Sequence, residues 1–249
     1  DDRLAKFSLG FSKEIGDQVT IRHLLRHTSG FDDLFNDEYL ATYRSLLDIN
    51  AKMPLLRDKP LLSKPGTQYK YSNYGYIVLG AILEKLEQKP FKQIIENHIF
   101  TPIGVSDTHY ELTDAVMGKA RSYRYYTDRP KADKTDILEN VTPDGGMYST
   151  PNDIISFYSN LFYSNNLLND EYKAVLASNY KTPTKAWSEI ANSPTAAWSS
   201  YGGAPGVSAA AEILIKDKLI VVVLANTDGL VAQKISQEIV STYKNDPND

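Results

Sequence analysis

The sequence predicts an α+β fold in which helices fill most of the chain and strands gather near its end. Apolar residues recur at helical spacing in three stretches, residues 76–86, 91–99 and 154–161. Two β-rich runs, residues 209–215 and 219–225, are joined by Lys216-Asp217-Lys218, a pattern typical of an antiparallel hairpin. Helices and strands that are segregated along the chain indicate an α+β protein with separate layers.

The N-terminal half shows clear starts and stops for three helices. Thr20 can cap a helix over residues 21–27, and Gly30 supplies a left-handed stop. A turn at Pro65-Gly66-Thr67 precedes a buried helix that begins near Asn73. Pro90 suits a first helical turn, and the amphipathic helix that follows ends near residues 102–104.

The C-terminal half begins with a change of composition. Residues 122–140 are rich in Tyr, Arg, Lys and Asp without apolar periodicity, which predicts an exposed loop or an irregular hairpin. Thr150 can then cap a helix with Pro151 in its first position and Asp153 reaching back, and residues 229–243 return to helix. We expect a mostly helical subdomain over residues 1–195, and terminal strands with a C-terminal helix over 196–249, within one compact catalytic-type unit.

Composition excludes several classes of function. The 249 residues carry a formal net charge of −4 without a run of Lys or Arg, which argues against nucleic acid as a partner. The absence of cysteine rules out disulfides, thiolate nucleophiles and zinc–thiolate sites. The longest apolar run is strand-sized, far below the roughly 18 residues of a membrane span. Since no Gly-rich phosphate loop follows a strand, we expect no cofactor.

A pair of histidines invites a metal interpretation that the surrounding residues do not support. His23 and His27 lie four residues apart, on one face of the first predicted helix. Leu24 stands where the metalloprotease motif requires Glu, and no third ligand is suggested. We therefore expect both histidines to be structural and predict no metal site.

The string Tyr71-Ser72-Asn73 stands at the entrance of the buried helix. A tyrosine there can act as a general base or acid if nearby cations lower its pKa from about 10, and Lys70 adjoins it. The alternative is that Tyr71 only packs and Asn73 caps the helix.

A second string, Gly202-Gly203-Ala204-Pro205-Gly206, precedes the predicted hairpin. Closely spaced glycines let a substrate approach the backbone and use its N–H groups, as an oxyanion hole requires. The alternative is a Gly-Pro turn between two strands.

Taken in order, these strings resemble a known family. Residues 19–30, which end in His-Thr-Ser-Gly, and residues 65–76 closely resemble class C β-lactamase-like serine hydrolases, a group that includes penicillin-binding proteins, D-amino-acid peptidases and esterases. Further landmarks match in sequence: residues 101–104 with 107–108, residues 145–150 with Asp153, and residues 203–206. The resemblance extends over nearly the whole chain.

The resemblance implies a β-lactamase/transpeptidase-like fold, an antiparallel sheet flanked by helices beside a helical subdomain. It implies acylation of a serine, with Tyr71 as general base or acid and Asn73 positioning the substrate. Ser200, Tyr201, Gly202 and Gly203 take the oxyanion and substrate-binding stations. Gly203 is the expected oxyanion N–H donor, or Ala204 in a shifted register.

The third motif departs from the family pattern. Family members place Lys-Thr-Gly or His-x-Gly where this chain has Ser200-Tyr201-Gly202, so the cation is lost. The shifted string Tyr201-Gly202-Gly203 resembles an aromatic-Gly-Gly version found in some esterases. We therefore expect an ester, small amide or peptide substrate rather than a β-lactam.

The nucleophile is the second departure. The family's Ser-x-x-Lys helix comes before the His-Thr-Ser-Gly string, so we expect that helix and the N-terminal strands to lie upstream of residue 1. The literal match Ser178-Asn179-Tyr180-Lys181 is rejected, because Pro183 opposes a continuing helix. A competing hypothesis is a non-catalytic relative that binds a peptide, glycan or acyl ligand. Many relatives suggest a periplasmic or secreted location.

Overall fold

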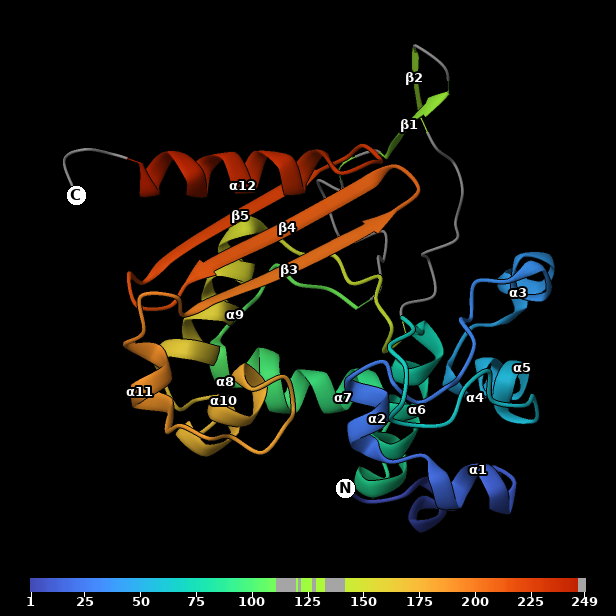
Figure 1. The fold of residues 1–249 in the computed structure, drawn as a ribbon. Coiled ribbons are helices and arrows are strands. Elements are labelled where there is room, and N and C mark those ends of the chain that lie inside the picture. Colours follow the sequence, from blue (N-terminus) through green and yellow to red (C-terminus); the bar gives the residue numbers. More distant parts are fainter. Residues whose placement is uncertain (111–119, 121, 127–128, 133–141, 246–249) are drawn as a thin grey trace. The chain divides into compact units, whose positions relative to one another are not determined.

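The computed structural model describes residues 1–110, 120, 122–126, 129–132 and 142–245 (Figure 1). The chain divides into two compact units. Unit 1 comprises Asp1–Ile99 and Asp136–Met147, and unit 2 comprises Phe100–Thr135 and Tyr148–Asp249. The expected boundary at residue 195 falls inside unit 2, because helices that precede this residue pack against strands that follow it.

Unit 1 is helical. Its elements are η1 (Leu4–Phe7), α1 (Lys13–Gln18), α2 (Ile21–Leu25), α3 (Asp37–Thr42), η2 (Tyr43–Ser45), α4 (Ile49–Lys52), α5 (Pro54–Arg57), α6 (Asn73–Glu87) and α7 (Phe91–Ile95). A π-helical turn, η3 (Glu96–Phe100), continues α7, and the boundary between the units falls within it. The predicted buried helix is α6, and Ser72 rather than Asn73 caps it, because the Ser72 Oγ accepts from the Gly75 N–H at 3.3 Å.

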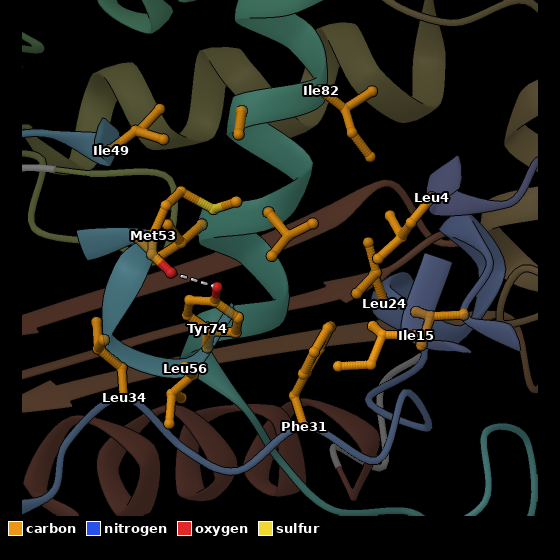
Figure 2. Close-up of a cluster of buried hydrophobic side chains, with 14 of the residues drawn as sticks. Leu4, Ile15, Leu24, Phe31, Leu34, Ile49, Met53, Leu56, Tyr74 and Ile82 are labelled. Carbon is orange, nitrogen blue, oxygen red and sulfur yellow. Dashed lines mark hydrogen bonds between the residues drawn. The ribbon is translucent and has the colours of Figure 1, made fainter. Parts of the chain in front are cut away.

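The core of unit 1 forms around α6, with side chains from α1, α2, α4 and α5 (Figure 2). Tyr74 is fully buried at its centre, and its hydroxyl donates to the Met53 carbonyl at 2.6 Å. This bond satisfies the polar end of a ring that otherwise lies among apolar side chains, including the Phe31 ring at 5.2 Å between centroids. Gly80 permits a close approach farther along α6, because a Cβ there would lie 2.1 Å from the Pro143 Cγ. Residues 142–147 therefore pack directly on α6.

Unit 2 combines a sheet with helices. Its elements are α8 (Thr101–Ile103), β1 (Tyr123–Tyr126), β2 (Arg129–Ala132), α9 (Pro151–Tyr163), α10 (Asp170–Ala177), α11 (Trp187–Ala191), β3 (Ala197–Ala204), β4 (Val207–Leu214), β5 (Leu219–Ala225) and α12 (Val231–Lys244). Strands β3, β4 and β5 form an antiparallel sheet in chain order. The predicted hairpin is confirmed as β4–β5, and β3 is a further strand that contains most of the glycine string.

The two faces of this sheet carry different helices, with α12 on one and α9 on the other (Figure 1). Alternation along β4 explains the arrangement. Ala211 and Ile213 belong to the core that also contains Phe162 and Trp187. On the opposite face, the Ser208 Oγ accepts from the backbone N–H of Ala232 in α12 at 3.1 Å. The α+β prediction is confirmed by these layers.

Several local expectations need correction. Residues 91–104 do not form one helix, but α7, the π-helical turn and α8, which ends at Gly104 with φ +67°. Thr150 does cap α9, with Pro151 at its first position, yet Asp153 does not reach back. Its carboxylate accepts instead from the Asp107 N–H at 2.9 Å and the Thr108 hydroxyl at 2.8 Å.

The expected loop or irregular hairpin over residues 122–140 contains the antiparallel pair β1–β2, and residues 127–128 and 133–140 lie outside the described part. No helix in the described ranges has both the length and the apolar character that a membrane crossing requires.

Candidate active site

The His27-Thr28-Ser29-Gly30 string begins at the end of α2. The helix stops at Leu25, two residues earlier than predicted, and His27 rather than Gly30 takes the left-handed conformation that ends it, with φ +52°. The Thr28 N–H donates to the His23 carbonyl at 2.8 Å and the His27 N–H to the Leu24 carbonyl at 3.1 Å. These two bonds form a Schellman motif, so the string redirects the chain immediately after the helix.

The redirected segment binds the second string. The Lys70 N–H donates to the His27 carbonyl at 2.8 Å, and the Ser72 N–H donates to the His27 Nδ1 at 3.2 Å. The Ser72 hydroxyl donates to the Asp32 carbonyl at 2.8 Å. Residues 27–33 therefore hold residues 70–73 at the start of α6, and the two strings form one structural element of unit 1.

Asn73 is fixed by a carboxylate that the sequence did not single out. Its backbone N–H donates to the Asp33 Oδ1 at 2.9 Å, and its Nδ2 lies 3.0 Å from the same oxygen and 3.3 Å from the Asp33 Oδ2. With its Nδ2 turned toward Asp33, Asn73 presents its Oδ1 to the Tyr71 hydroxyl, 3.5 Å away.

Tyr71 is accessible, as a proton-transferring group must be. Its side chain is 54% exposed, and its ring stacks on the His27 imidazole with 4.4 Å between ring centroids. On its other side His27 stacks on Tyr76 at 5.1 Å. Burial lowers the pKa of His27, which suits a neutral ring whose Nδ1 accepts from Ser72. The His27 ring thus stacks on both tyrosine rings, Tyr71 and Tyr76, and fixes the position of the Tyr71 ring.

The electrostatics of Tyr71 differ from the expectation of nearby cations. Burial and then the charges of Asp33 and Asp144 raise the pKa of the Tyr71 phenol above its usual 10. Lys70 does not counter them, because its ammonium binds the Asp32 carboxylate at 2.7 Å. In this environment Tyr71 is a protonated phenol, able to donate a hydrogen bond or a proton.

A buried charge cluster anchors residues 142–144 of unit 1. Lys52 in α4 is 3% exposed, and its ammonium donates to the Thr142 hydroxyl at 2.5 Å and lies 3.9 Å from the Asp144 carboxylate. The same ammonium stands 5.8 Å from the centroid of the Tyr39 ring. Asp144 acts on the Tyr71 pKa, so Lys52 fixes one of the charges that set the ionisation of the site.

The glycine string lies in unit 2, at the end of β3. Gly202, Gly203 and Ala204 belong to the strand, and Pro205-Gly206 forms the two-residue loop into β4. Gly206 has φ +73°, as the third residue of a type II turn requires. The alternative of a Gly-Pro turn therefore applies to residues 205–206 and leaves the two preceding glycines in an edge strand.

The register assigns the backbone groups of these glycines. A two-residue loop requires that the pair which closes it, Ala204 with Val207, exchange both backbone hydrogen bonds. The next pair, Gly203 with Ser208, is then a non-hydrogen-bonded pair, so the Gly203 N–H points away from β4 toward the open edge of the sheet. Among the described residues, and apart from residues 202–204 themselves, no heavy atom lies within 4 Å of a Cβ placed on Gly203. The register therefore favours Gly203 over Ala204 as an outward-facing backbone N–H donor at this edge of β3.

Ser200 and Tyr201 project to opposite faces of the sheet. Ser200 pairs with Ala211 on the α9 face, where burial raises the pKa of the Tyr158 phenol and the Ser200 side chain offsets part of that rise. The Tyr201 hydroxyl donates to the Glu212 carboxylate at 2.5 Å and accepts from the Gln237 Nε2 of α12 at 3.2 Å. Of the two side chains expected to bind substrate, Tyr201 is therefore already hydrogen-bonded within unit 2.

Glu212 was missed by the sequence reasoning. It is 8% exposed, and its carboxylate accepts a second hydrogen bond, from the Ser199 hydroxyl at 2.5 Å. A lone carboxylate in the otherwise apolar run 209–215 was the signal that could have identified it. Asp33 gave no comparable signal, because it is one of two adjacent aspartates in a loop.

His23 and the Ser178–Lys181 string both lie in local turns at helix ends. His23 is part of a capping box with Thr20, since its Nδ1 accepts from the Thr20 N–H at 3.2 Å. Within the described residues, no group of three His, Cys, Asp or Glu is placed to hold a metal ion. Ser178 and Lys181 lie on a tight turn after α10, with left-handed Asn179 and Tyr180 between them, so they share no helix.

Comparison with known proteins bears on the family and the fold of the chain. The Beta-lactamase family profile matches residues 1–241 of the chain. A putative D-alanyl-D-alanine carboxypeptidase of Escherichia coli (strain K12) is 29% identical over 116 residues, which cover 43% of this chain and 27% of that relative. The chain thus matches only about a quarter of this curated relative's length.

Two solved structures show the same fold at low identity. A penicillin-binding protein from Bacillus halodurans aligns with a TM-score of 0.70 and 24% identity, covering 96% of this chain and 81% of its own. EstCE1, a hydrolase with promiscuous acyltransferase activity, aligns with a TM-score of 0.72 and 21% identity, covering 95% of this chain and 76% of its own. The α+β architecture is therefore that of penicillin-binding proteins.

Proposed function

Because this chain belongs to the Beta-lactamase family, a family of serine hydrolases, we propose that its full-length product cleaves an ester or a small amide or peptide through an acyl-enzyme. The observation that supports this most is the arrangement at the start of α6. The Tyr71 hydroxyl is accessible, and the Asn73 amide beside it is held in one orientation. The half-exposed phenol stacked on His27 supports this role beside the alternative that Tyr71 only packs.

In the proposed reaction, the serine of a Ser-x-x-Lys element upstream of residue 1 attacks the acyl carbon. Its Oγ–C bond forms while its proton passes to the lysine amine, and the carbonyl oxygen becomes an oxyanion that the Gly203 N–H stabilises. Tyr71, protonated because of its raised pKa, gives its proton to the leaving alcohol or amine as the bond to the acyl carbon breaks.

Water then attacks the acyl-enzyme and gives up one proton to Tyr71, which restores the phenol, while the serine oxygen leaves and regains its own proton from the lysine. Asn73 positions the acyl group through its amide.

The substrate preference follows from β3. Ser200 replaces the cation of the family pattern, and its side chain lies on the face of the sheet that packs against α9. The strand therefore offers backbone N–H groups and no positive charge for a substrate carboxylate, which favours neutral esters and small amides.

The test compares two tyrosine variants of the full-length product. Tyr71→Phe should lower kcat/KM for a p-nitrophenyl ester and for a D-alanyl amide by about 10²- to 10⁴-fold, the usual contribution of a general acid or base. Tyr69→Phe, the same change two residues away on a 71% exposed side chain, should leave both values unchanged. Equal activity of the two variants would refute the role of Tyr71. A folded full-length product that hydrolyses neither substrate would support the non-catalytic binding alternative, which the missing cation on β3 favours.

A further inference from the structure

The Asp33 carboxylate makes an unusually complete set of contacts with one neighbour. Its Oδ1 accepts from both nitrogens of Asn73, at 2.9 Å from the backbone and 3.0 Å from Nδ2, and from the Leu34 N–H at 2.7 Å. Its Oδ2 lies 3.3 Å from the same Nδ2. Charged acceptors make stronger hydrogen bonds than neutral ones, so this carboxylate holds both the backbone and the side chain of Asn73.

The contact also suits the start of α6. Asn73 is the first residue of this 15-residue helix, whose free N–H groups carry partial positive charge. A carboxylate at that position stabilises the helix start, and the partial positive charge of the helix N-terminus in turn stabilises the carboxylate. Asp33 reaches it from the loop that follows the His27–Gly30 string, 40 residues earlier in the chain.

The consequence lies in the orientation of an amide. The terminal torsion of an Asn side chain is broad and nearly two-fold, so without a partner either its oxygen or its nitrogen can face Tyr71. Asp33 accepts hydrogen bonds only, so it selects the orientation in which Nδ2 points to Asp33 and Oδ1 points to the Tyr71 hydroxyl, 3.5 Å away.

We propose that Asp33 is a positioning residue of this site, which fixes the amide orientation of Asn73 and thereby the hydrogen-bond acceptor that faces the Tyr71 hydroxyl. This inference rests on the proposed function for its catalytic consequence, but its structural part can be measured without activity. Asp33 itself acts through Asn73.

The first experiment uses NMR on the chain with ring-labelled tyrosine and labelled asparagine, with Tyr71→Phe and Asn73→Asp to assign the signals. Asp33→Ala should move the two Nδ2 proton signals of Asn73 toward those of a free amide and speed their exchange with water. Asp33→Asn, which keeps one acceptor oxygen and removes the charge, should lower the pKa of Tyr71 while it preserves part of the amide protection.

Asp37→Asn is the control, because it removes an exposed carboxylate at the start of α3. It should change neither the Asn73 signals nor the Tyr71 titration. Asn73 signals that are the same in Asp33→Ala and in the parent chain would overturn the proposal.

The second experiment measures kinetics on the full-length product. Asp33→Ala should lower kcat by about 10- to 100-fold, the scale of a misplaced catalytic group, with a much smaller change in KM. Asp37→Asn should retain the parent values. If the parent hydrolyses its substrates and Asp33→Ala keeps its kcat, the proposal fails while the proposed function stands. If the parent is inactive, the proposed function fails, and the NMR comparison decides the role of Asp33 alone.

Discussion

Gly30→Ala tests whether the end of the His27–Gly30 string packs closely against residues 62–63 or forms an ordinary exposed loop. Gly30 has φ +82°, and a Cβ at this position would lie 2.2 Å from the carbonyl oxygen of Ser63. The obstacle is backbone, so it cannot rotate away. The Gly30 carbonyl also accepts from the Leu62 N–H at 2.8 Å, which ties the same two segments together.

Gly10 provides a matched control in the same unit. Its φ is also +82°, but the nearest atom to its Cβ would be the Arg57 Nη1 at 3.2 Å, the end of a flexible side chain. Both alanines incur the left-handed backbone cost of about 1–2 kcal/mol. Only Gly30→Ala adds overpacking, about 1–3 kcal/mol, and a weakened hydrogen bond of about 1 kcal/mol. We expect a loss of about 1–2 kcal/mol for Gly10→Ala and about 3–6 kcal/mol for Gly30→Ala.

Urea denaturation followed by far-ultraviolet circular dichroism measures these losses. The chain's two tryptophans, Trp187 and Trp198, both lie in unit 2, so their fluorescence follows that unit separately. The free energies of unfolding of the two variants, measured from the dichroism transition, should differ by about 2 kcal/mol or more, because only Gly30→Ala clashes with the backbone. Equal losses would refute the close approach of residues 30 and 63, and with it the structural role of the string.

Three further predictions concern the buried Lys52, the buried Glu212 and the two histidines of the His23–His27 pair. Lys52→Met should destabilise unit 1 by about 3 kcal/mol, because it leaves the Asp144 carboxylate buried without its cation, and adding Asp144→Asn should recover part of this loss in a double-mutant cycle by urea denaturation. Additive losses would contradict the pairing. Glu212→Gln should lower the free energy of unfolding by about 1–2 kcal/mol, since the hydroxyls of Ser199 and Tyr201 lose a charged acceptor. Tryptophan fluorescence, to which Trp198 on β3 contributes, should follow this unfolding transition. An unshifted urea midpoint would count against the role of Glu212. Burial lowers the pKa of both His23 and His27 below 6.5, so the folded protein binds fewer protons than the unfolded chain, and stability should fall as the pH drops below 6.5. Urea titrations at several pH values should show this slope, with a smaller slope in His27→Gln, and equal slopes would disprove the contribution of His27.

The sequence predicted those helices and strands whose formation depends on residues close together in the chain. The Thr20 and Thr150 caps, the buried helix after Tyr71 and the β4–β5 hairpin depend on residues within one or two turns of each other. The stop of α2 was misplaced, because glycine is the usual left-handed residue and here His27 takes that conformation. No bounds were predicted for strand β3, which was implied only by the alternative of a Gly-Pro turn between two strands, because its polar and glycine residues lack the alternation of a buried strand.

The site depends on contacts that no local pattern contains. Asp33 meets Asn73 across 40 residues, and Lys52 meets Thr142 across 90. The ionisation of Tyr71 was expected from its neighbour Lys70, yet the chain directs that ammonium to Asp32 and brings carboxylates to the phenol instead. Tyr71, Asn73 and Gly203 could be named as candidates from the sequence, but the groups that surround them could not.

The most direct test of the account is covalent labelling of the full-length product with a fluorophosphonate, followed by mass spectrometry of the labelled peptide. The account predicts one adduct, on the serine of a Ser-x-x-Lys element upstream of Asp1. It also predicts labelling that is at least about 100-fold slower in Tyr71→Phe and unchanged in Tyr69→Phe. An adduct on Ser178, or equal labelling rates in the two tyrosine variants, would contradict it.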